Sequence, residues 1–227
     1  MIGVFDSGVG GLTAIAQIRK MNPHVDVCFF ADRENAPYGT KTEKELLELV
    51  KADIRKLRCF GADKILMACC TASTVHRHLP SEMKNISVPI IAPTAKEAAR
   101  VTKYGKIGVI ATRATVASGA FRGELSHFSN VTEIFELPLQ RLVSLVEGGA
   151  SDQSVTRAEK DEICRMLLPI REKEVDTLIL GCTHFPHLEE TIGEFLPKVK
   201  LVSSSLEGAK EILKNTSPVG TGKTFYL

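Results

Sequence analysis

The sequence contains no tryptophan, and aromatic residues of all kinds make up only 6% of its 227 positions. It also lacks an excess of either charge, because 29 basic side chains stand against 27 acidic ones and the net charge is +2. The basic residues are scattered along the chain. Nucleic-acid binding usually requires a basic stripe or aromatic side chains on which bases stack. We therefore expect no nucleic-acid partner.

Long apolar segments are missing as well. No apolar run approaches the roughly 18 residues that cross a bilayer, and the first residues, Met1–Gly11, lack the basic region and cleavage site of a signal peptide. We therefore expect a cytoplasmic protein with no membrane partner, in which thiols stay reduced. No cysteine pair has the Cys-x-x-Cys spacing of a zinc or redox site; the six cysteines are Cys28, Cys59, Cys69, Cys70, Cys164 and Cys182.

The hydrophobic content of 44% and the charged content of 25% are typical of a globular protein with a core. Short apolar, β-branched runs alternate with amphipathic segments, which predicts an α/β fold with largely parallel sheets. The clearest helical spacing covers 42–58 and 155–172. Strands are expected at 2–5, 25–31, 64–68, 88–92, 106–111, 131–137, 177–181 and 200–203, and the tail from Asn215 is expected to be a loop.

Two of these strands end alike. Residues 64–71 and 177–184 both run from apolar residues into a small residue, then a thiol and a hydroxyl, and they lie half a chain apart. This spacing suggests two similar α/β lobes. Because ligands of such folds bind beyond the carboxyl ends of the strands, both thiols should line one crevice. The other cysteines, Cys28, Cys59 and Cys164, are expected to be buried core residues.

A glycine-rich turn follows the first strand, in the order Asp6-Ser7-Gly8-Val9-Gly10-Gly11. Such a turn brings backbone N–H groups and a helix N-terminus close to an anion. The alternative is a tight turn in which Asp6 acts as a local cap.

Two thiols facing each other across an anion-binding crevice suit the inversion of a carbon acid without a cofactor. One thiolate takes the α-proton from one face, and a thiol on the other face returns a proton. An ordinary thiol has a pKa of about 8.5, so a neighbouring group must help to deprotonate it. By sequence position Asp6 and His184 are the candidates, and hydroxyls at Ser7, Thr71 and Thr183 could hold a carboxylate.

These residues fall in six motifs through which the chain resembles the aspartate/glutamate racemases over nearly its whole length. The motifs are Asp6-Ser-Gly-Val-Gly-Gly-Leu-Thr13, Ala36-Pro-Tyr-Gly-Thr40, Ala68-Cys-x-Thr-Ala-Ser73, Ile107-Gly-Val-Ile-Ala-Thr-x-Ala-Thr115, Leu142-x-x-Leu-Val-Glu147 and Leu180-Gly-Cys-Thr-His-Phe-Pro186.

The resemblance implies two pseudo-symmetric lobes with the active site in the cleft between them. Residues 94–203 would form a lobe inserted into the one built from 1–93 and 204–227. The resemblance also implies that no cofactor and no metal are needed, and that homodimers are common, in more than one arrangement. Cys69 and Cys182 would react, Asp6 would serve the first thiol, and Glu147 and His184 the second. Substrate would contact Ser7, Pro37, Tyr38, Gly39, Cys70, Thr71, Thr115 and Thr183.

The chain also departs from the family pattern. Cys70 stands where the family normally has asparagine, Ile91–Thr94 where it commonly has Glu-Pro-Gly, and Ser203–Ser205 where it has Asp-Ser-Gly. Two neighbouring thiols then compete for the reactive position. We choose Cys69, because Ala68 and Gly181 occupy matching strand-end positions and the family places its thiol two residues before the threonine. Consecutive side chains of an extended segment also point in opposite directions.

The function that this pattern predicts is racemisation of an acidic amino acid, namely interconversion of L- and D-glutamate to supply peptidoglycan precursors. Racemisation of aspartate or a related acid is one alternative. A non-catalytic amino-acid-binding or interaction module on the same fold is another, favoured by Cys70 but not by the presence of both thiols, Asp6, Glu147 and His184.

Overall fold

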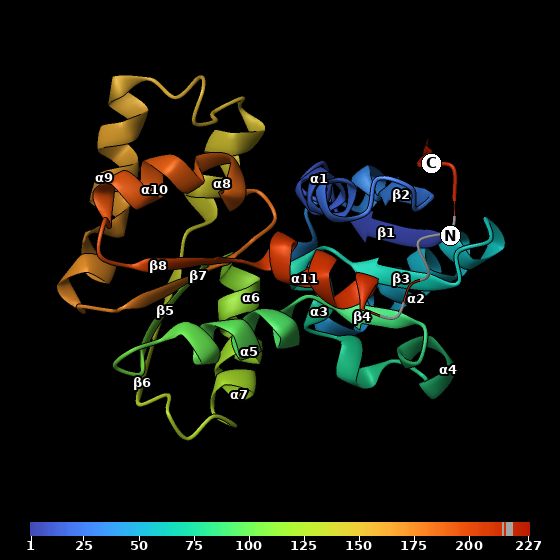
Figure 1. The fold of residues 1–227 in the computed structure, drawn as a ribbon, viewed down its shortest axis with the longest axis horizontal. Coiled ribbons are helices and arrows are strands. Elements are labelled where there is room, and N and C mark those ends of the chain that lie inside the picture. Colours follow the sequence, from blue (N-terminus) through green and yellow to red (C-terminus); the bar gives the residue numbers. More distant parts are fainter. Residues whose placement is uncertain (215, 217–219) are drawn as a thin grey trace.

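The computed structural model describes residues 1–214, 216 and 220–227. They form two sheets whose strand pairs are all parallel, so the fold is α/β as expected. The first sheet has the strand order β4-β3-β1-β2-β9 and the second has the order β6-β5-β7-β8 (Figure 1). The strands are β1 (Ile2–Asp6), β2 (Val27–Ala31), β3 (Lys64–Met67), β4 (Ser87–Pro89), β5 (Lys106–Ala111), β6 (Glu133–Pro138), β7 (Thr177–Gly181), β8 (Lys200–Ser203) and β9 (Thr224–Tyr226).

Helices connect these strands. The α-helices are α1 (Leu12–Met21), α2 (Glu43–Cys59), α3 (Cys70–Ser73), α4 (Ser81–Lys84), α5 (Ile91–Val101), α6 (Arg113–Ala117), α7 (Ala120–Leu125), α8 (Gln140–Glu147), α9 (Arg157–Glu172), α10 (Glu189–Phe195) and α11 (Ser204–Leu213). Four short 3₁₀ helices are η1 (Arg33–Asn35), η2 (Tyr38–Thr40), η3 (His76–His78) and η4 (Phe185–Leu188).

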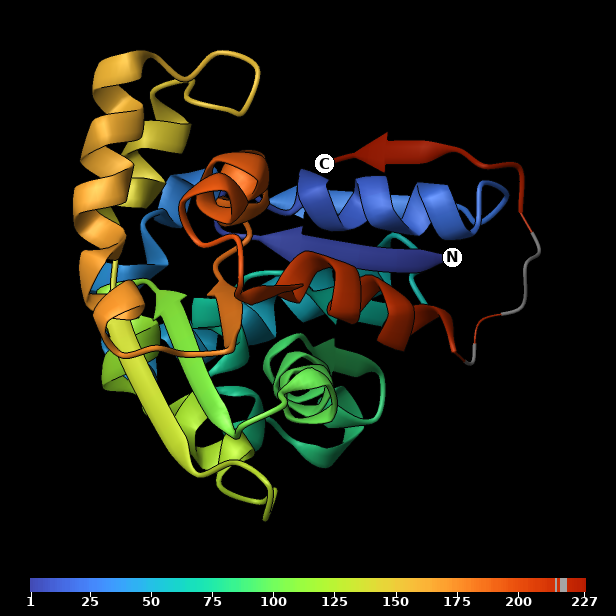
Figure 2. The ribbon, with the colours of Figure 1, turned by 60° about the vertical axis from the view of Figure 1, so that its left-hand side comes forward.

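The central strands are buried on both faces, as continuous apolar runs in parallel sheets require. One core lies between the two sheets and contains side chains of α1, α5, α7 and α11. A second core covers the outer face of the first sheet under α2. A third covers the outer face of the second sheet under α8, α9 and α10, and Figure 2 shows α9 lying along that side.

The two longest helices begin where their sequences place a capping box. Thr42 accepts a hydrogen bond from the backbone of Glu45, whose carboxylate accepts one from the backbone of Thr42. Thr156 and Glu159 repeat the arrangement at α9. Each pair satisfies donors that the helix leaves unpaired, and this fixes the start of the helix.

Three sequence expectations were wrong in detail. The fourth strand ends at Pro89, and Ile91–Ala92 already belong to α5. Pro93 is compatible with the first turn of a helix, because the N–H that it lacks has no partner there. Of the cysteines expected in the core, Cys28 is buried, Cys164 is half-buried and Cys59 is exposed at the end of α2.

The third error concerns the tail, in which Thr224–Tyr226 forms the parallel strand β9 beside β2. Figure 2 shows β9 as the red arrow near the C-terminus. The Asp26 carboxylate accepts hydrogen bonds from the backbones of Thr221 and Lys223, and these hold the tail in register. Asn215 and residues 217–219 of the predicted loop lie outside the described residues.

The chain enters the second sheet through α5 and leaves it through α11, which lies between the two sheets (Figure 1). The first sheet draws on residues 2–89 and 224–226, and the second on 106–203. The lobe boundaries at 93/94 and 203/204 therefore stay a prediction, the first inside α5 and the second at the start of α11. At the centre of α11, a Cβ on Gly208 would lie 2.7 Å from Ile90 Cγ2.

We predict that Gly208→Ala lowers the free energy of unfolding by about 1–3 kcal/mol, because the added methyl overpacks the core between the sheets. Gly193→Ala in α10 is the matched control. There a Cβ would lie 3.8 Å from Leu201 Cδ1, an ordinary van der Waals distance. Because alanine lowers the conformational entropy of the unfolded chain, this substitution should raise the free energy of unfolding by roughly 0.5–1 kcal/mol. Urea unfolding of both variants checks the opposite signs. Equal effects of the two substitutions would contradict the assigned contact.

Candidate active site

A cavity of about 240 Å³ lies where the carboxyl ends of β1, β3 and β7 approach one another. All but two of the predicted site residues line it. Those that do are Ser7, Pro37, Tyr38, Gly39, Cys69, Cys70, Thr71, Glu147, Cys182, Thr183 and His184. The exceptions, Asp6 and Thr115, are fully buried. Both thiols therefore line one crevice beyond the carboxyl ends of the strands, where the sequence predicted them.

Cys69 follows β3 and is the N-cap residue of α3. Its sulfur accepts a hydrogen bond from the backbone N–H of Ala72 at 3.5 Å and lies 3.6 Å from Ser7 Oγ. Burial raises the pKa of the Cys69 thiol to about 11, and the neighbouring Asp6 adds to the rise. At neutral pH Cys69 is thus a neutral thiol.

Cys182 follows β7 and has a basic neighbour. Its sulfur lies 3.5 Å from His184 Nδ1, and His184 Nε2 lies 3.6 Å from Glu147 Oε1. His184 is buried, whereas Glu147, at the end of α8, is largely exposed. Burial raises the pKa of Cys182 well above its ordinary range, opposed by the backbone N–H of His184. This thiol is also neutral, with an imidazole beside it that can take its proton.

Asp6 joins the two sheets behind the thiols. Its carboxylate accepts a hydrogen bond from the backbone N–H of Gly8 at 2.9 Å and another from Thr183 Oγ1 at 3.0 Å. Burial raises the pKa of Asp6, although a protonated His184 would oppose the rise and these hydrogen bonds do oppose it. The carboxyl touches the turn of one sheet and the strand end of the other, so it fixes their separation.

Gly10 makes that close approach possible. A Cβ at this position would lie 2.3 Å from Thr183 Oγ1 and 2.9 Å from His184 Nδ1. No side chain fits in that space without moving the second sheet away. The glycine-rich turn therefore serves to seat the residues after β7 against the turn after β1.

Three threonine hydroxyls form a second link between the sheets. Thr71 Oγ1 lies 3.1 Å from both Thr112 Oγ1 and Thr115 Oγ1, and Thr112 donates to Thr115 at 2.9 Å. Thr71 and Thr112 face the cavity, whereas Thr115 supports them from behind. The Thr115 hydroxyl orients two pocket hydroxyls.

Cys70 begins α3, and its thiol donates to Ser204 Oγ at 3.5 Å. Burial raises the pKa of Cys70 well above its ordinary range. Its contact with α11 leaves Cys69, the preceding residue, to approach Ser7 at the other side of the turn.

Residues 36–39 line one side of the cavity, with a cis peptide bond before Pro37, and together with Thr40 they are called the 36–40 wall. The Tyr38 side chain is only 1% exposed, and its hydroxyl lies between the carboxylates of Asp32 and Asp53. Tyr38 therefore holds the wall from behind with its phenol.

Seven residues that line the cavity were not among the predicted site residues, and these are Gly8, Val9, Arg33, Ala36, Thr112, Gln140 and Val143. Gly8, Val9, Ala36 and Thr112 stand at named positions of the sequence motifs, whereas the other three do not. Arg33 and Thr112 follow β2 and β5 closely, so the rule that ligands bind beyond strand ends was sufficient to find them. Gln140 and Val143 lie on α8, where the sequence carries no comparable signal.

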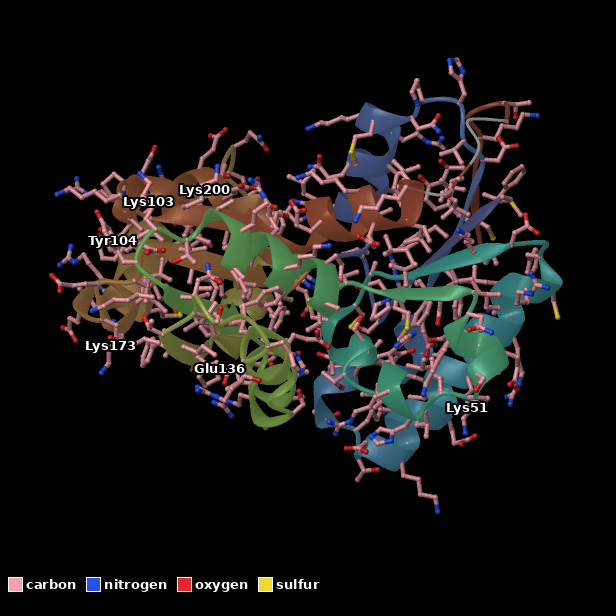
Figure 3. All side chains as sticks on the ribbon, turned by 60° about the horizontal axis from the view of Figure 1, so that its bottom comes forward. Lys51, Lys103, Tyr104, Glu136, Lys173 and Lys200 are labelled. Carbon is pink, nitrogen blue, oxygen red and sulfur yellow. The ribbon has the colours of Figure 1, made fainter. Side chains whose placement is uncertain are left out.

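A second hollow, lined by Tyr104, Arg171 and Phe195 among others, lies in the outer part of the second sheet's lobe, and none of the predicted site residues line it. Lys103, Tyr104, Lys173 and Lys200 lie at that end of the molecule, away from the first sheet (Figure 3). Within the described ranges no three His, Cys, Asp or Glu side chains are grouped to hold a metal ion. Over the same residues, no helix is both long and apolar enough to cross a membrane.

A family model described as Asp/Glu/Hydantoin racemase matches residues 12–212. The chain belongs to this racemase family. Among curated relatives, a glutamate racemase from Desulforudis audaxviator is 41% identical over 203 residues, which are 88% of this chain and 73% of that protein.

Solved structures of glutamate racemases share this racemase fold. An isoform from Bacillus anthracis superimposes with a TM-score of 0.89 at 32% identity and covers all of this chain, which in turn covers 86% of that one. The enzyme from Francisella tularensis, in complex with D-glutamate, has a TM-score of 0.85 at 29% identity, covering 99% of this chain and 85% of that one.

The high pKa of the Cys69 thiol predicts slow alkylation in the substrate-free protein. Because only the thiolate reacts, the rate of Cys69 modification by iodoacetamide should rise about tenfold per pH unit between pH 7 and 9. Peptide mass spectrometry measures this rate, with the exposed Cys59 in the same samples as the accessible reference. A rate for Cys69 that levels off below pH 9 would show a thiol that is already ionised.

Proposed function

We propose that the protein interconverts L- and D-glutamate by a two-thiol mechanism, with Cys69 and Cys182 on opposite faces of the α-carbon. The main support is that these thiols follow strands of different sheets and line one cavity. The family and the curated relatives favour glutamate over aspartate as the substrate. The product would supply D-glutamate for peptidoglycan precursors.

The reaction conserves all atoms and needs no external reductant or oxidant. The thiolate of one cysteine removes the α-proton, so the C–H bond breaks and an S–H bond forms. The thiol of the other cysteine protonates the carbanion from the opposite face and becomes the thiolate. The roles reverse in the other direction, so each cysteine acts once as base and once as acid.

Burial favours the neutral form of both thiols, so a neighbouring base must take the proton of the thiol that begins the reaction. His184 Nδ1 lies within reach of the Cys182 thiol proton, and Glu147 would stabilise the imidazolium that results. Asp6 is the candidate to serve the first thiol, and its charge raises the pKa of Cys69, so it favours the protonated form that returns a proton to the substrate. It acts from the buried side and does not line the cavity.

The charge that develops on the substrate needs donors beyond the carboxyl ends of the strands. The hydroxyls of Ser7, Thr71 and Thr183 line the cavity and are suited to bind the α-carboxylate and the enolate-like oxygen. The side-chain carboxylate would extend toward residues 36–40, with Arg33 at the same wall. We also propose that the protein acts in the cytoplasm, where such thiols stay reduced. That it forms a homodimer stays a prediction.

The test is incubation of the purified protein with L-glutamate in deuterated water, followed by circular dichroism and α-deuteration. We expect loss of the optical signal, full exchange, and a slower reaction with aspartate. Dialysis against a chelator together with a carbonyl reagent should leave the rate unchanged. Folded protein that neither exchanges nor racemises glutamate would favour a non-catalytic module, and faster turnover of aspartate would favour the other racemase.

The two-base assignment predicts that Cys69→Ser and Cys182→Ser each lower racemisation by at least a hundredfold, because a hydroxyl is a far weaker acid than a thiol. Each variant should still exchange the α-proton of one enantiomer, and the two should prefer opposite enantiomers. Deuterium exchange from pure L- and D-glutamate measures this. The same preference in both variants would contradict the assignment.

Cys70→Ala is the matched control for these variants, since it removes a thiol from the same cavity wall. We expect it to fold and to keep part of the activity, and Cys70→Asn to equal or exceed the parent in affinity for glutamate. If Cys70→Ala is inactive while Cys69→Ala is active, the reactive position has been placed one residue too early.

A further inference from the structure

Behind the 36–40 wall lies a buried cluster of two carboxyl groups and one phenol. Tyr38 Oη lies 2.7 Å from Asp32 Oδ2 and 2.6 Å from Asp53 Oδ2. The three residues come from η2, the turn after β2, and α2, and each is at most 4% exposed. The cluster thus ties three separate elements together in a space that water does not reach freely.

The two short contacts of Tyr38 need two protons, and the phenol supplies only one if both carboxyl groups are ionised. A phenol carries one proton and can donate one hydrogen bond. Two ionised carboxylates would leave one Oδ2 facing the phenolic oxygen at 2.6–2.7 Å with no proton between them. Such a short contact between two acceptors is repulsive, so one of the carboxyl groups must supply a second proton.

The surroundings decide which carboxyl is protonated. Both oxygens of Asp32 accept from the side-chain amide of Asn35, at 2.9 and 3.0 Å, in addition to the phenol. Among the described residues, the hydrogen-bond partner of the Asp53 side chain is Tyr38. Asp32 thus has a donor besides Tyr38, whereas Asp53 has none in the described part of the chain, so the carboxylate form is better stabilised at Asp32. The second proton therefore belongs on Asp53.

We propose that Asp53 is a positioning residue of the active site, which in its protonated form donates its carboxyl proton to Tyr38 and thereby holds the 36–40 wall of the cavity in place. Asp53 donates to Tyr38, and Tyr38 donates to Asp32. No atom of Asp53 lines the cavity, so it acts through Tyr38. The inference rests on the proposed function in that the wall is taken to bind glutamate.

Other charged groups around Asp53 are few. Desolvation raises its pKa to about 7; Asp32 raises the pKa as well, whereas the hydrogen bond of Tyr38 and the charge of Lys56, one turn along α2, lower it. The strand β2, on which α2 packs, contributes the buried Cys28 thiol, whose pKa is raised by burial. Asp53 is therefore the group of this cluster that titrates near neutral pH.

The displaced pKa has a definite sign for stability. Because the folded state binds the Asp53 proton more tightly than the unfolded chain does, the stabilisation is complete below the ordinary pKa and is lost as pH rises through about 7. Ionised Asp53 competes with Asp32 for the single phenolic proton. Tyr38 then loses one of its two anchors, and η2, which packs against α3 and α6 at the cavity, loosens.

The first measurement uses no substrate. The unfolding equilibrium constant of the parent, divided by that of Asp53→Asn, should rise by about tenfold per pH unit from pH 5 to 7 and level off above. The asparagine amide donates to Tyr38 as the protonated carboxyl does and does not titrate. Glu48→Gln is the control, since the exposed Glu48 lies on the same helix, where it pairs with Lys51, and its ratio should stay nearly flat.

The second measurement is kinetic. Between pH 6 and 8.5 the KM for glutamate of the parent should rise at least threefold relative to that of Asp53→Asn, while the ratio of their kcat values stays constant. Titration of Cys69, Cys182 and His184 cancels in these ratios, because both proteins contain the same reacting groups. Asp53→Leu, which donates nothing to Tyr38, should have a raised KM at every pH.

The outcomes separate the two proposals. A flat unfolding ratio, or a KM for Asp53→Asn that follows the parent across the pH range, overturns the role of Asp53. If Asp53→Asn does not fold, the carboxyl carbon of Asp53 in the parent, followed by NMR, must titrate near pH 7 or the proposal fails. If the parent does not racemise glutamate, the proposed function is wrong. The pH dependence of the unfolding ratio then still tests whether Asp53 donates a proton to Tyr38.

Discussion

The buried contact between Asp6 and Thr183 is the constraint on which the rest of the site depends. A buried carboxyl group without hydrogen-bond partners costs several kcal/mol, so the turn after β1 and the end of β7 must stay close enough to supply partners to Asp6. Gly10 leaves the space that this closeness needs. Cys182 and His184 adjoin Thr183 in the sequence, so the distance between the Cys69 and Cys182 thiols depends on the same contact.

Burial has opposite uses at the two ends of the cavity. At the thiols it favours the neutral form, which suits groups that must each return a proton as readily as they remove one. At Asp53 it retains a proton on a carboxyl, and that proton becomes part of the scaffold. Desolvation thus keeps the reacting thiols protonated at one end of the cavity. At the other end it favours the protonated form of Asp53, so that Asp53 can hold Tyr38 and the 36–40 wall.

The sequence predicted the parts of the fold that local pattern controls. The strands 106–111, 177–181 and 200–203 have the predicted bounds, because apolar runs between turn residues need no distant information. β9 was missed because its register comes from Asp26, some 195 positions away. Likewise, the family motif predicted that Tyr38 lies at the cavity, but the sequence could not predict the direction of its phenol. The partner carboxyl of Asp53 lies on α2, and the apolar spacing of that helix does not show that an aspartate is buried there.

The path of the chain between the sheets has a mechanical consequence. Both crossings are helices, and α5 and α11 pack side by side and share the core between the sheets. Ile90, the residue before α5, and Gly208 of α11 lie where the two crossings meet, so a side chain larger than hydrogen at position 208 would push them apart. The relative position of the two sheets, and with it the width of the crevice, therefore depends on how closely these two helices pack.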